Sequence, residues 1–128
     1  MHFLLAVLFA GLLNIPSVAL TPVAHADEPP LSTVDWQAYA STTAKKAGLS
    51  PVQLTRVIGC ESNWVATSTG DNGTSFGLAQ LHYPSRDWGI STSTAFDEKT
   101  SIDIMVAAWK RGEQNRWSCY KILGYSTH

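Results

Sequence analysis

A glutamate that could serve as a catalytic acid lies near the expected end of a helix. Glu61 stands between Cys60 and Ser62. The helical period of about 3.6 residues places it on the same apolar face as Val57 and Ile58. A carboxyl group partly removed from water ionises less readily, so its pKa rises above the usual value of about 4.3. Such a group keeps its proton near neutral pH and can donate it to a leaving group.

A plainer role for Glu61 is also open. A glutamate at a helix end can bend towards solvent and pair with a lysine or arginine. An isolated glutamate is expected to have this plainer role. The argument for catalysis depends on the motif formed by the residues from Glu61 to Gln80.

Cys60 and Cys119 are the two cysteines of the chain. An even number of cysteines in an exported protein indicates a disulfide. A bridge between them would close a loop of about 60 residues and stabilise the fold by roughly 4 kcal/mol. A zinc site would need both cysteines with His82 and His128, without the usual paired spacings. A nucleophilic Cys60 with His82 as its base has no supporting motif. We therefore predict a disulfide.

The helix that carries Glu61 has a well-marked start. Ser50 is the predicted N-cap, Pro51 occupies the first helical position, and Gln53 completes an S-x-x-Q capping box. We expect this helix to run from Pro51 to about Ser62, with Glu61 in its last turn.

An earlier amphipathic helix is predicted after Thr33. Thr33 is a suitable N-cap, and Gly48 ends the periodic pattern. One face of this helix collects these apolar and small residues: Trp36, Tyr39, Ala40, Thr43, Ala44 and Ala47.

The second half of the domain is predicted to contain a hairpin and a further helix. Turn-forming residues dominate 67–75, TSTGDNGTS, and favour a loop or small hairpin. An amphipathic pattern over 98–112 predicts a helix that ends at Gly112. The core candidates of these segments are Phe76, Leu78, Ala79, Leu81, Ile102, Met105, Val106 and Trp109. The fold class is therefore mainly α, with a short β-hairpin and one disulfide.

The N-terminal segment has the pattern of a secretory signal. Residues 3–20 are almost wholly apolar, and Ala-His-Ala at 24–26 is an A-x-A cleavage pattern, so a signal peptide over 1–26 is predicted. An uncleaved membrane anchor is the alternative, because the apolar run approaches the length of a span. Asn14 and Pro16 within it favour cleavage. We expect a protein that is secreted or lies in the periplasm or cell envelope.

After the signal segment, residues 27–32 are predicted to form a linker and 33–125 a single domain. All nine Lys and Arg and all ten Asp and Glu lie after residue 26, and the formal net charge is −1. No basic stripe is present to neutralise phosphates, which argues against nucleic acid as a partner.

The order of these motifs resembles the lysozyme-like superfamily, in which a Glu-Ser pair ends a helix and a Gly-Leu-x-Gln strand follows. Glu-Ser-Asn-Trp at 61–64 and Gly-Leu-Ala-Gln at 77–80 are similar to the motifs of soluble lytic transglycosylases. Cys-Glu-Ser at 60–62, with Trp-Ser-Cys at 117–119, is similar to resuscitation-promoting factors, including the implied bridge. The resemblance covers roughly 49–120. It implies a lysozyme-like α+β fold with the hairpin beside an active-site cleft.

The resemblance also implies roles for single residues. Glu61 would be the catalytic acid that cleaves the β-1,4 bond between N-acetylmuramic acid and N-acetylglucosamine in peptidoglycan. Ser62 would support the site, and Gln80 would line the cleft and hydrogen-bond the sugar or the loop. The partner would be the peptidoglycan glycan strand.

The sequence departs from animal-type lysozymes at the second carboxylate. Those enzymes read T-D-Y-G-I-x-Q, and here Ser75 occupies the position of the aspartate. A retaining mechanism needs two carboxyl groups about 5 Å apart, and a serine cannot act as the second. We therefore favour lytic transglycosylation, in which Glu61 alone serves as acid and then as base, closing a 1,6-anhydro product. The alternative is hydrolysis with the help of Asp71, or with solvent held by Ser75 and Gln80.

Asp71 belongs to the turn Gly-Asp-Asn-Gly, and a role as a turn residue only is its simpler interpretation. Tyr83 and Trp88 follow the Gln80 segment and are candidate sugar-binding aromatic residues, whereas Trp109 is assigned to the core.

We expect no metal, no other cofactor and a monomer. A non-catalytic glycan-binding relative of the same fold is a different class of hypothesis, which the retained Glu61 disfavours.

Overall fold

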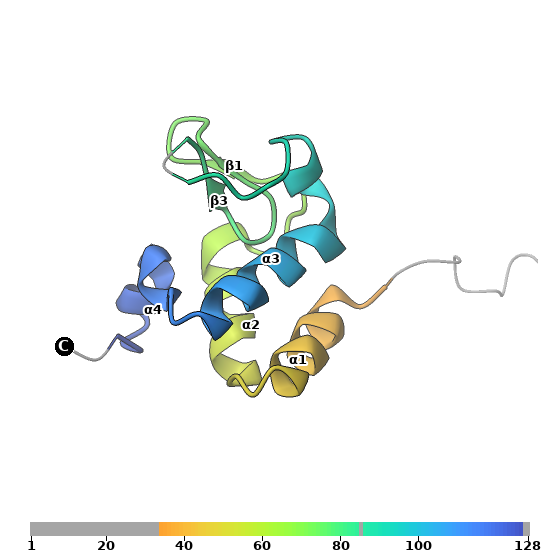
Figure 1. Cartoon of the computed structure of the whole chain (residues 1–128), viewed down its shortest axis with the longest axis vertical. Helices are drawn as coiled ribbons and strands as arrows, with labels where there is room; N and C mark the ends of the chain where they lie inside the picture. Colours follow the sequence, from red (N-terminus) through yellow and green to blue (C-terminus); the bar gives the residue numbers. More distant parts are fainter. Residues whose placement is uncertain (1–33, 85, 127–128) are drawn as a thin grey trace, which may run out of the picture. The chain divides into compact units, whose positions relative to one another are not determined.

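The computed structural model describes residues 34–84 and 86–126 (Figure 1). The predicted signal peptide and linker, 1–32, lie outside these residues. The helices and strands in chain order are α1 (Trp36–Lys46), α2 (Pro51–Ser62), β1 (Thr69–Gly70), β2 (Ser75–Phe76), β3 (Leu81–His82), the 3₁₀ helix η2 (Thr94–Phe96), α3 (Glu98–Lys110), the 3₁₀ helix η3 (Gln114–Arg116) and α4 (Ser118–Ile122). The prediction of a small, mainly helical domain with a short β element and one disulfide is confirmed. Among the helices of the described residues, none is both long and apolar enough to cross a membrane.

The helix starts follow local hydrogen bonding. Ser50 caps α2 as predicted, because its Oγ accepts a hydrogen bond from the backbone N–H of Gln53 at 3.2 Å. The prediction of Thr33 as the cap of α1 is wrong. Asp35 caps this helix, and its carboxylate accepts from the N–H of Ala38 at 3.0 Å. Asn63, in the left-handed conformation at φ 53°, ends α2 directly after Ser62.

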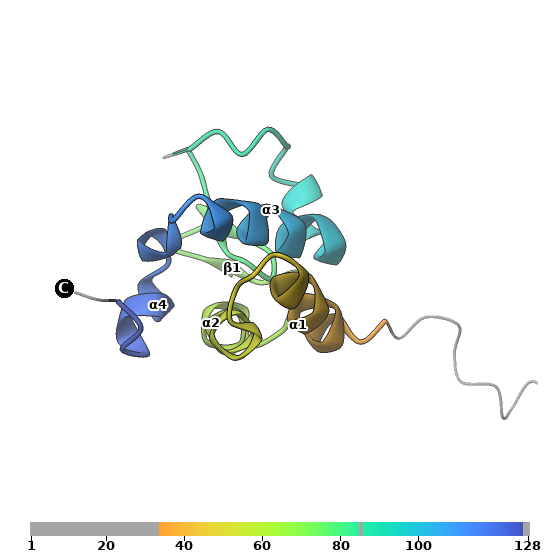
Figure 2. The same cartoon turned by 60° about the horizontal axis from the view of Figure 1, so that its bottom comes forward.

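The core lies where α2 and α3 pack with α1 and the sheet. α1 and α4 contact α2 from opposite sides, and α3 also contacts α1 (Figures 1 and 2). The predicted apolar face of α3 is buried, and so are the core residues expected from α2 and most of those near the sheet. The larger buried side chains are Leu54, Val57, Ile58, Leu78, Leu81, Ile102, Met105, Val106 and Trp109. This core orients the end of α2 towards the sheet.

The strands form one antiparallel sheet in the order β1-β2-β3. Ser75 in the central strand pairs with Gly70 on one side and with His82 on the other. Asp71 and Asn72 connect β1 to β2 with φ values of 51° and 58°, a conformation that Asp and Asn tolerate better than most residues. The turn formers seen in the sequence therefore make a tight hairpin whose tip carries Asp71.

The segment Gly-Leu-Ala-Gln at 77–80 is a turn between β2 and β3, not the strand that the resemblance implied. Gly77 at φ 80° and Gln80 at φ 47° both adopt left-handed conformations. A side chain on Gly77 would overlap the carbonyl oxygen of Ala95. Glycine is therefore required here by both conformation and space. The turn reverses the chain and returns β3 alongside β2.

Candidate functional site

The predicted disulfide joins the end of α2 to the start of α4. Cys60 and Cys119 are bonded, with their Cα atoms 6.0 Å apart. Their neighbours in sequence therefore also meet, and the segment that precedes Cys119 approaches Glu61. This bridge completes one wall of a pocket that the sheet forms from the other side.

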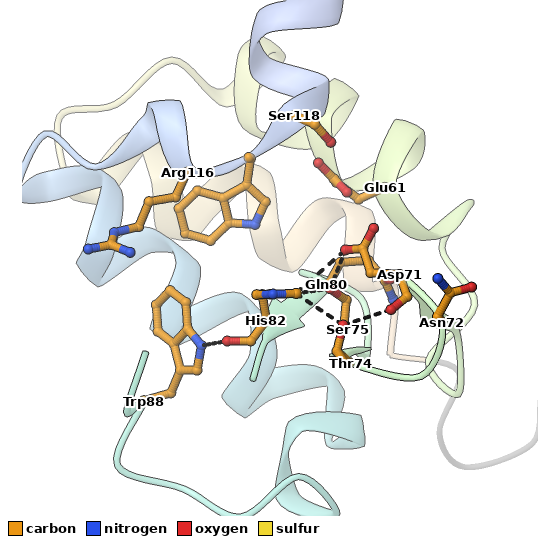
Figure 3. Close-up of a pocket in the computed structure, with 11 residues that line it drawn as sticks. Glu61, Asp71, Asn72, Thr74, Ser75, Gln80, His82, Trp88, Arg116 and Ser118 are labelled. Carbon is orange, nitrogen blue, oxygen red and sulfur yellow. Dashed lines mark hydrogen bonds and ion pairs between the residues drawn. The ribbon is translucent and has the colours of Figure 1, made fainter. Parts of the chain in front are cut away.

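The pocket has a volume of about 520 Å³ and opens to solvent. Its walls come from the end of α2, the β1–β2 hairpin, β3, the loop that follows β3, and the start of α4 (Figure 3). The residues that line it are Glu61, Asp71, Asn72, Thr74, Ser75, Gln80, His82, Trp88, Arg116, Trp117 and Ser118. The sequence therefore folds so that two carboxyl groups, from Glu61 and Asp71, share one solvent-accessible space.

Glu61 is half-buried at the edge of this pocket. Burial raises the pKa of its carboxyl group. The backbone N–H of Cys119, which donates to Glu61 Oε1 at 3.0 Å, acts in the opposite direction and lowers this pKa. The negative charge of Asp71 raises the pKa further, and a hydrogen bond from the Ser118 side chain lowers it. The net result is a pKa above the ordinary value for glutamate.

The plainer role considered for Glu61, an exposed ion pair, does not match its contacts. Among the described residues, no lysine or arginine forms an ion pair with Glu61. Its carboxyl group instead faces Ser118 and the Asp71 side of the pocket (Figure 3). A half-buried carboxyl group without a neighbouring cation is suited to holding and donating a proton.

Asp71 is held at the pocket wall by the two strands that follow it. The Ser75 hydroxyl donates to Asp71 Oδ2 at 2.5 Å, and it lies 3.0 Å from His82 Nδ1. Asp71 Oδ2 is itself 3.7 Å from His82 Nδ1 (Figure 3). The Asp71 side chain is 68% exposed, so water reaches this carboxylate. Asp71 is therefore both a turn residue and a member of the pocket, and Ser75 orients it.

Gln80 and Trp88, two predicted cleft residues, line the pocket. The Gln80 carboxamide nitrogen donates to the carbonyl oxygens of Ser68 and Gly77 at 3.0 and 2.9 Å. Of the two roles expected for it, these bonds correspond to holding the loop. Trp88 is oriented by a 3.0 Å hydrogen bond from its indole N–H to the carbonyl oxygen of His82.

Ser62 and Tyr83, the other two candidates, lie outside the set of residues that line the pocket. Ser62 is buried, and its hydroxyl donates back to the carbonyl oxygen of Ile58 within α2 at 3.1 Å. The Tyr83 hydroxyl donates to the carbonyl oxygen of Ile90 at 2.8 Å, and its ring packs edge-on against Phe76. Tyr83 therefore does not line this pocket, and Ser62 can support the site only from within the core.

Sequence reasoning missed the contribution of 116–118 to the pocket. Trp117 is buried, and its indole N–H donates to the carbonyl oxygen of Ala79 at 2.6 Å. Its neighbours in sequence, Arg116 and Ser118, line the pocket together with it. The predicted bridge was a signal that could have found them, because residues next to Cys119 must approach those next to Cys60. His82 was considered as a zinc ligand or as a base for Cys60, whereas it lines the pocket and contacts Ser75.

Ionisation of Glu61 should lower the stability of the fold. The pKa of Glu61 is higher in the folded than in the unfolded protein. The protonated side chain therefore contributes stability, which is fully present below the unfolded pKa of about 4.3 and is lost as the pH rises through the folded pKa. Glu61→Gln should therefore unfold at the same denaturant concentration as the wild type in acid, and at a higher concentration near neutral pH. Urea titrations across this pH range measure the difference.

Glu113→Gln is the matched variant, for which we expect the opposite change in stability at neutral pH. The hydrogen bond from Arg86 is the largest influence on the Glu113 carboxyl group and lowers its pKa. Burial raises this pKa, the interactions with Arg111 lower it again, and the net pKa is lowered. Its contribution is present above the unfolded pKa and lost as pH falls through the folded one, so this variant should be less stable than the wild type at neutral pH. A Glu61→Gln protein less stable than the wild type at neutral pH would contradict the raised pKa.

The site holds a half-buried carboxyl group with a raised pKa, an exposed carboxylate and two tryptophan side chains. Within residues 34–84 and 86–126, no group of three or more His, Cys, Asp or Glu side chains is placed to hold a metal ion. No protein-family model, curated protein or solved structure matches the chain. The chemistry of the site is therefore inferred from its own residues.

Proposed function

We propose that the chain is a peptidoglycan-cleaving glycosidase of the lysozyme-like type, in which Glu61 protonates the oxygen of a β-1,4 glycosidic bond. The observation that carries the proposal is the environment of Glu61: half-buried in an open pocket, with a raised pKa and no cation paired to it among the described residues. The Glu-Ser and Gly-Leu-x-Gln motifs, which resemble those of lytic transglycosylases, supply the substrate class.

The favoured reaction is lytic transglycosylation, which needs one carboxyl group. Glu61 gives its proton to the glycosidic oxygen, the bond from this oxygen to C1 of N-acetylmuramic acid breaks, and the N-acetylglucosamine side leaves as an alcohol. The Glu61 carboxylate then takes the proton of the muramic acid 6-hydroxyl, whose oxygen bonds to C1 and closes a 1,6-anhydro ring. Glu61 ends protonated and no water is consumed.

The hydrogen bond from Cys119 suits this double role. A donor to the ionised form stabilises that form, so the Cys119 N–H supports the carboxylate that exists between the two proton transfers. Burial supports the protonated form that begins the cycle. The two influences therefore act on the two protonation states between which an acid that later acts as a base must alternate.

Hydrolysis is the second candidate, and the position of Asp71 favours it. Asp71 lines the same pocket as Glu61, its charge acts on Glu61, and Ser75 orients its carboxylate. In this mechanism Asp71 takes a proton from water or stabilises positive charge at C1, and Glu61 remains the acid. The products then carry one added water and no anhydro end.

An extracytoplasmic setting is part of the proposal. A disulfide persists in oxidising compartments such as the cell exterior or a bacterial periplasm, and the bond between Cys60 and Cys119 agrees with the signal pattern at 1–26. Peptidoglycan glycan strands are available in those places. The protein would act there as a secreted or cell-envelope enzyme.

Product analysis of Asp71→Asn tests the proposal and separates the two reactions. Purified peptidoglycan is digested with wild type and variant, and the fragments are identified by mass spectrometry. For transglycosylation we expect 1,6-anhydro ends from both proteins and a rate within about tenfold of wild type. The alkaline limb of the pH–rate profile should also shift to lower pH, because the charge that raises the pKa of Glu61 is removed.

Asp35→Asn is the matched control, since asparagine caps a helix as well as aspartate does. Hydrated ends from the wild type, with a loss of at least about 100-fold in Asp71→Asn, would reject transglycosylation in favour of hydrolysis. Wild-type protein that releases neither kind of fragment would refute the proposed function.

A further inference from the structure

The pocket wall formed by Arg116 adjoins a cluster with more positive than negative charge. Glu113 pairs with three arginines: with Arg86, with Arg111 Nη2 at 2.9 Å, and with Arg116 Nε at 3.4 Å. One carboxylate therefore faces three guanidinium groups. The nearby Asp87 accepts a hydrogen bond from the backbone N–H of Gly89 and forms none of the ion pairs of the described residues. This leaves the cluster with surplus positive charge.

The three arginines are not equally engaged. Arg86 is 23% exposed, contacts Glu113 and stacks over the Trp88 ring with 4.7 Å to its centre. Arg111 reaches one Glu113 oxygen through both Nε, at 3.1 Å, and Nη2. Arg116 is 47% exposed, and its closest approach to Glu113, through Nε, is longer and reaches the oxygen that Arg86 also contacts. Among the described residues Arg116 has no ion-pair partner other than Glu113, and it is the member of the three that lines the pocket.

The charges of the pocket are therefore divided between its two ends. Figure 3 shows Arg116 and Trp88 at one end and Glu61 and Asp71 at the other. A ligand that spans the pocket meets carboxyl groups at one end and a guanidinium group at the other. A guanidinium fork matches a carboxylate with two parallel hydrogen bonds, which gives geometric selection as well as charge attraction.

We propose that Arg116 binds a carboxylate carried by the glycan substrate, at the end of the pocket away from Glu61. The proposal rests on the proposed function and specifies the ligand class that the cleft selects: a glycan with a carboxylate substituent in preference to a neutral one. In peptidoglycan this carboxylate belongs either to the lactyl ether of a muramic acid without its peptide or to the peptide stem.

Binding measurements on a protein that does not turn over test this role. The full chain with Glu61→Gln is titrated by calorimetry with three oligosaccharides of equal length: glycan with free lactyl groups, glycan with peptide stems, and a neutral N-acetylglucosamine oligomer. Adding Arg116→Gln should weaken binding of a carboxylate-bearing glycan about tenfold and leave the neutral oligomer within about twofold. The acidic ligand that loses affinity identifies the source of the carboxylate.

Two further variants keep the result specific. Arg116→Lys should recover only part of the affinity, because an ammonium group lacks the paired donors of a guanidinium. Lys45→Gln in α1 removes the same charge away from the pocket and should change nothing. Equal losses for acidic and neutral ligands, no loss for either, or no binding of any oligosaccharide would overturn the role of Arg116. Wild-type protein that binds acidic glycans but cleaves none would instead refute the proposed function.

Discussion

Glu61→Gln should abolish glycan cleavage and leave the fold intact. The variant keeps size and shape, and its carboxamide oxygen can still accept the hydrogen bond from the Cys119 N–H. It has no proton to give to the glycosidic oxygen and cannot take one back afterwards. A general acid contributes about 10²–10⁴ in rate, and because Glu61 serves both steps of the proposed reaction we expect a loss at the upper end of this range.

The measurement is the release of soluble fragments from purified peptidoglycan, with thermal unfolding as the check on folding. Glu98→Gln, in the first turn of α3 and outside the pocket, is the matched control and should retain wild-type activity. A folded Glu61→Gln protein with more than about a tenth of wild-type activity would remove the basis for Glu61 as the acid, since even a modest general acid contributes more than this. The pocket would then belong to a binding protein or to an enzyme with a different acid.

Loss of the disulfide should destabilise the protein by roughly 4 kcal/mol, because the bridge closes a loop of about 60 residues in the unfolded chain. This is a large part of the total stability of about 5–15 kcal/mol for a domain. The variant is Cys60→Ser with Cys119→Ser, and urea unfolding with and without a thiol reductant measures it. The wild type should shift to lower urea concentration on reduction, and the double variant should not respond.

Activity should fall more than stability alone explains. The bridge holds α4 against α2, and this contact supplies the Cys119 N–H to Glu61 and places Trp117 and Ser118 in the pocket wall. At an assay temperature where the double variant is still folded, this variant should cleave peptidoglycan at least about tenfold more slowly than the oxidised wild type. Full activity in a folded, bridge-free protein would show that the bridge does not position Glu61.

The sequence alone determined the features that depend on neighbours within one or two turns. The Ser50 cap, the Pro51 start and the apolar row of α2 required only local hydrogen bonds and the helical period, and so did the buried face of α3. The cysteine count was enough for the disulfide. The cap of α1 was not found in this way: Thr33 was predicted, whereas Asp35 caps the helix through a hydrogen bond from the N–H of Ala38 to its carboxylate.

Tertiary structure decided which of the candidate residues share a pocket. Ser62 and Tyr83 have the right types and lie near the motif in sequence, yet their hydroxyls bond to backbone carbonyls away from it. Arg116 and Ser118 line it from a segment that was assigned no sugar-binding role, because the bridge between Cys60 and Cys119 brings together segments that lie 59 residues apart in the chain. A helix cap is formed by adjacent residues, whereas a pocket is formed by distant segments that meet only when the core packs. The composition of the site, and the pairing of Asp71 with Ser75, therefore became visible only in three dimensions.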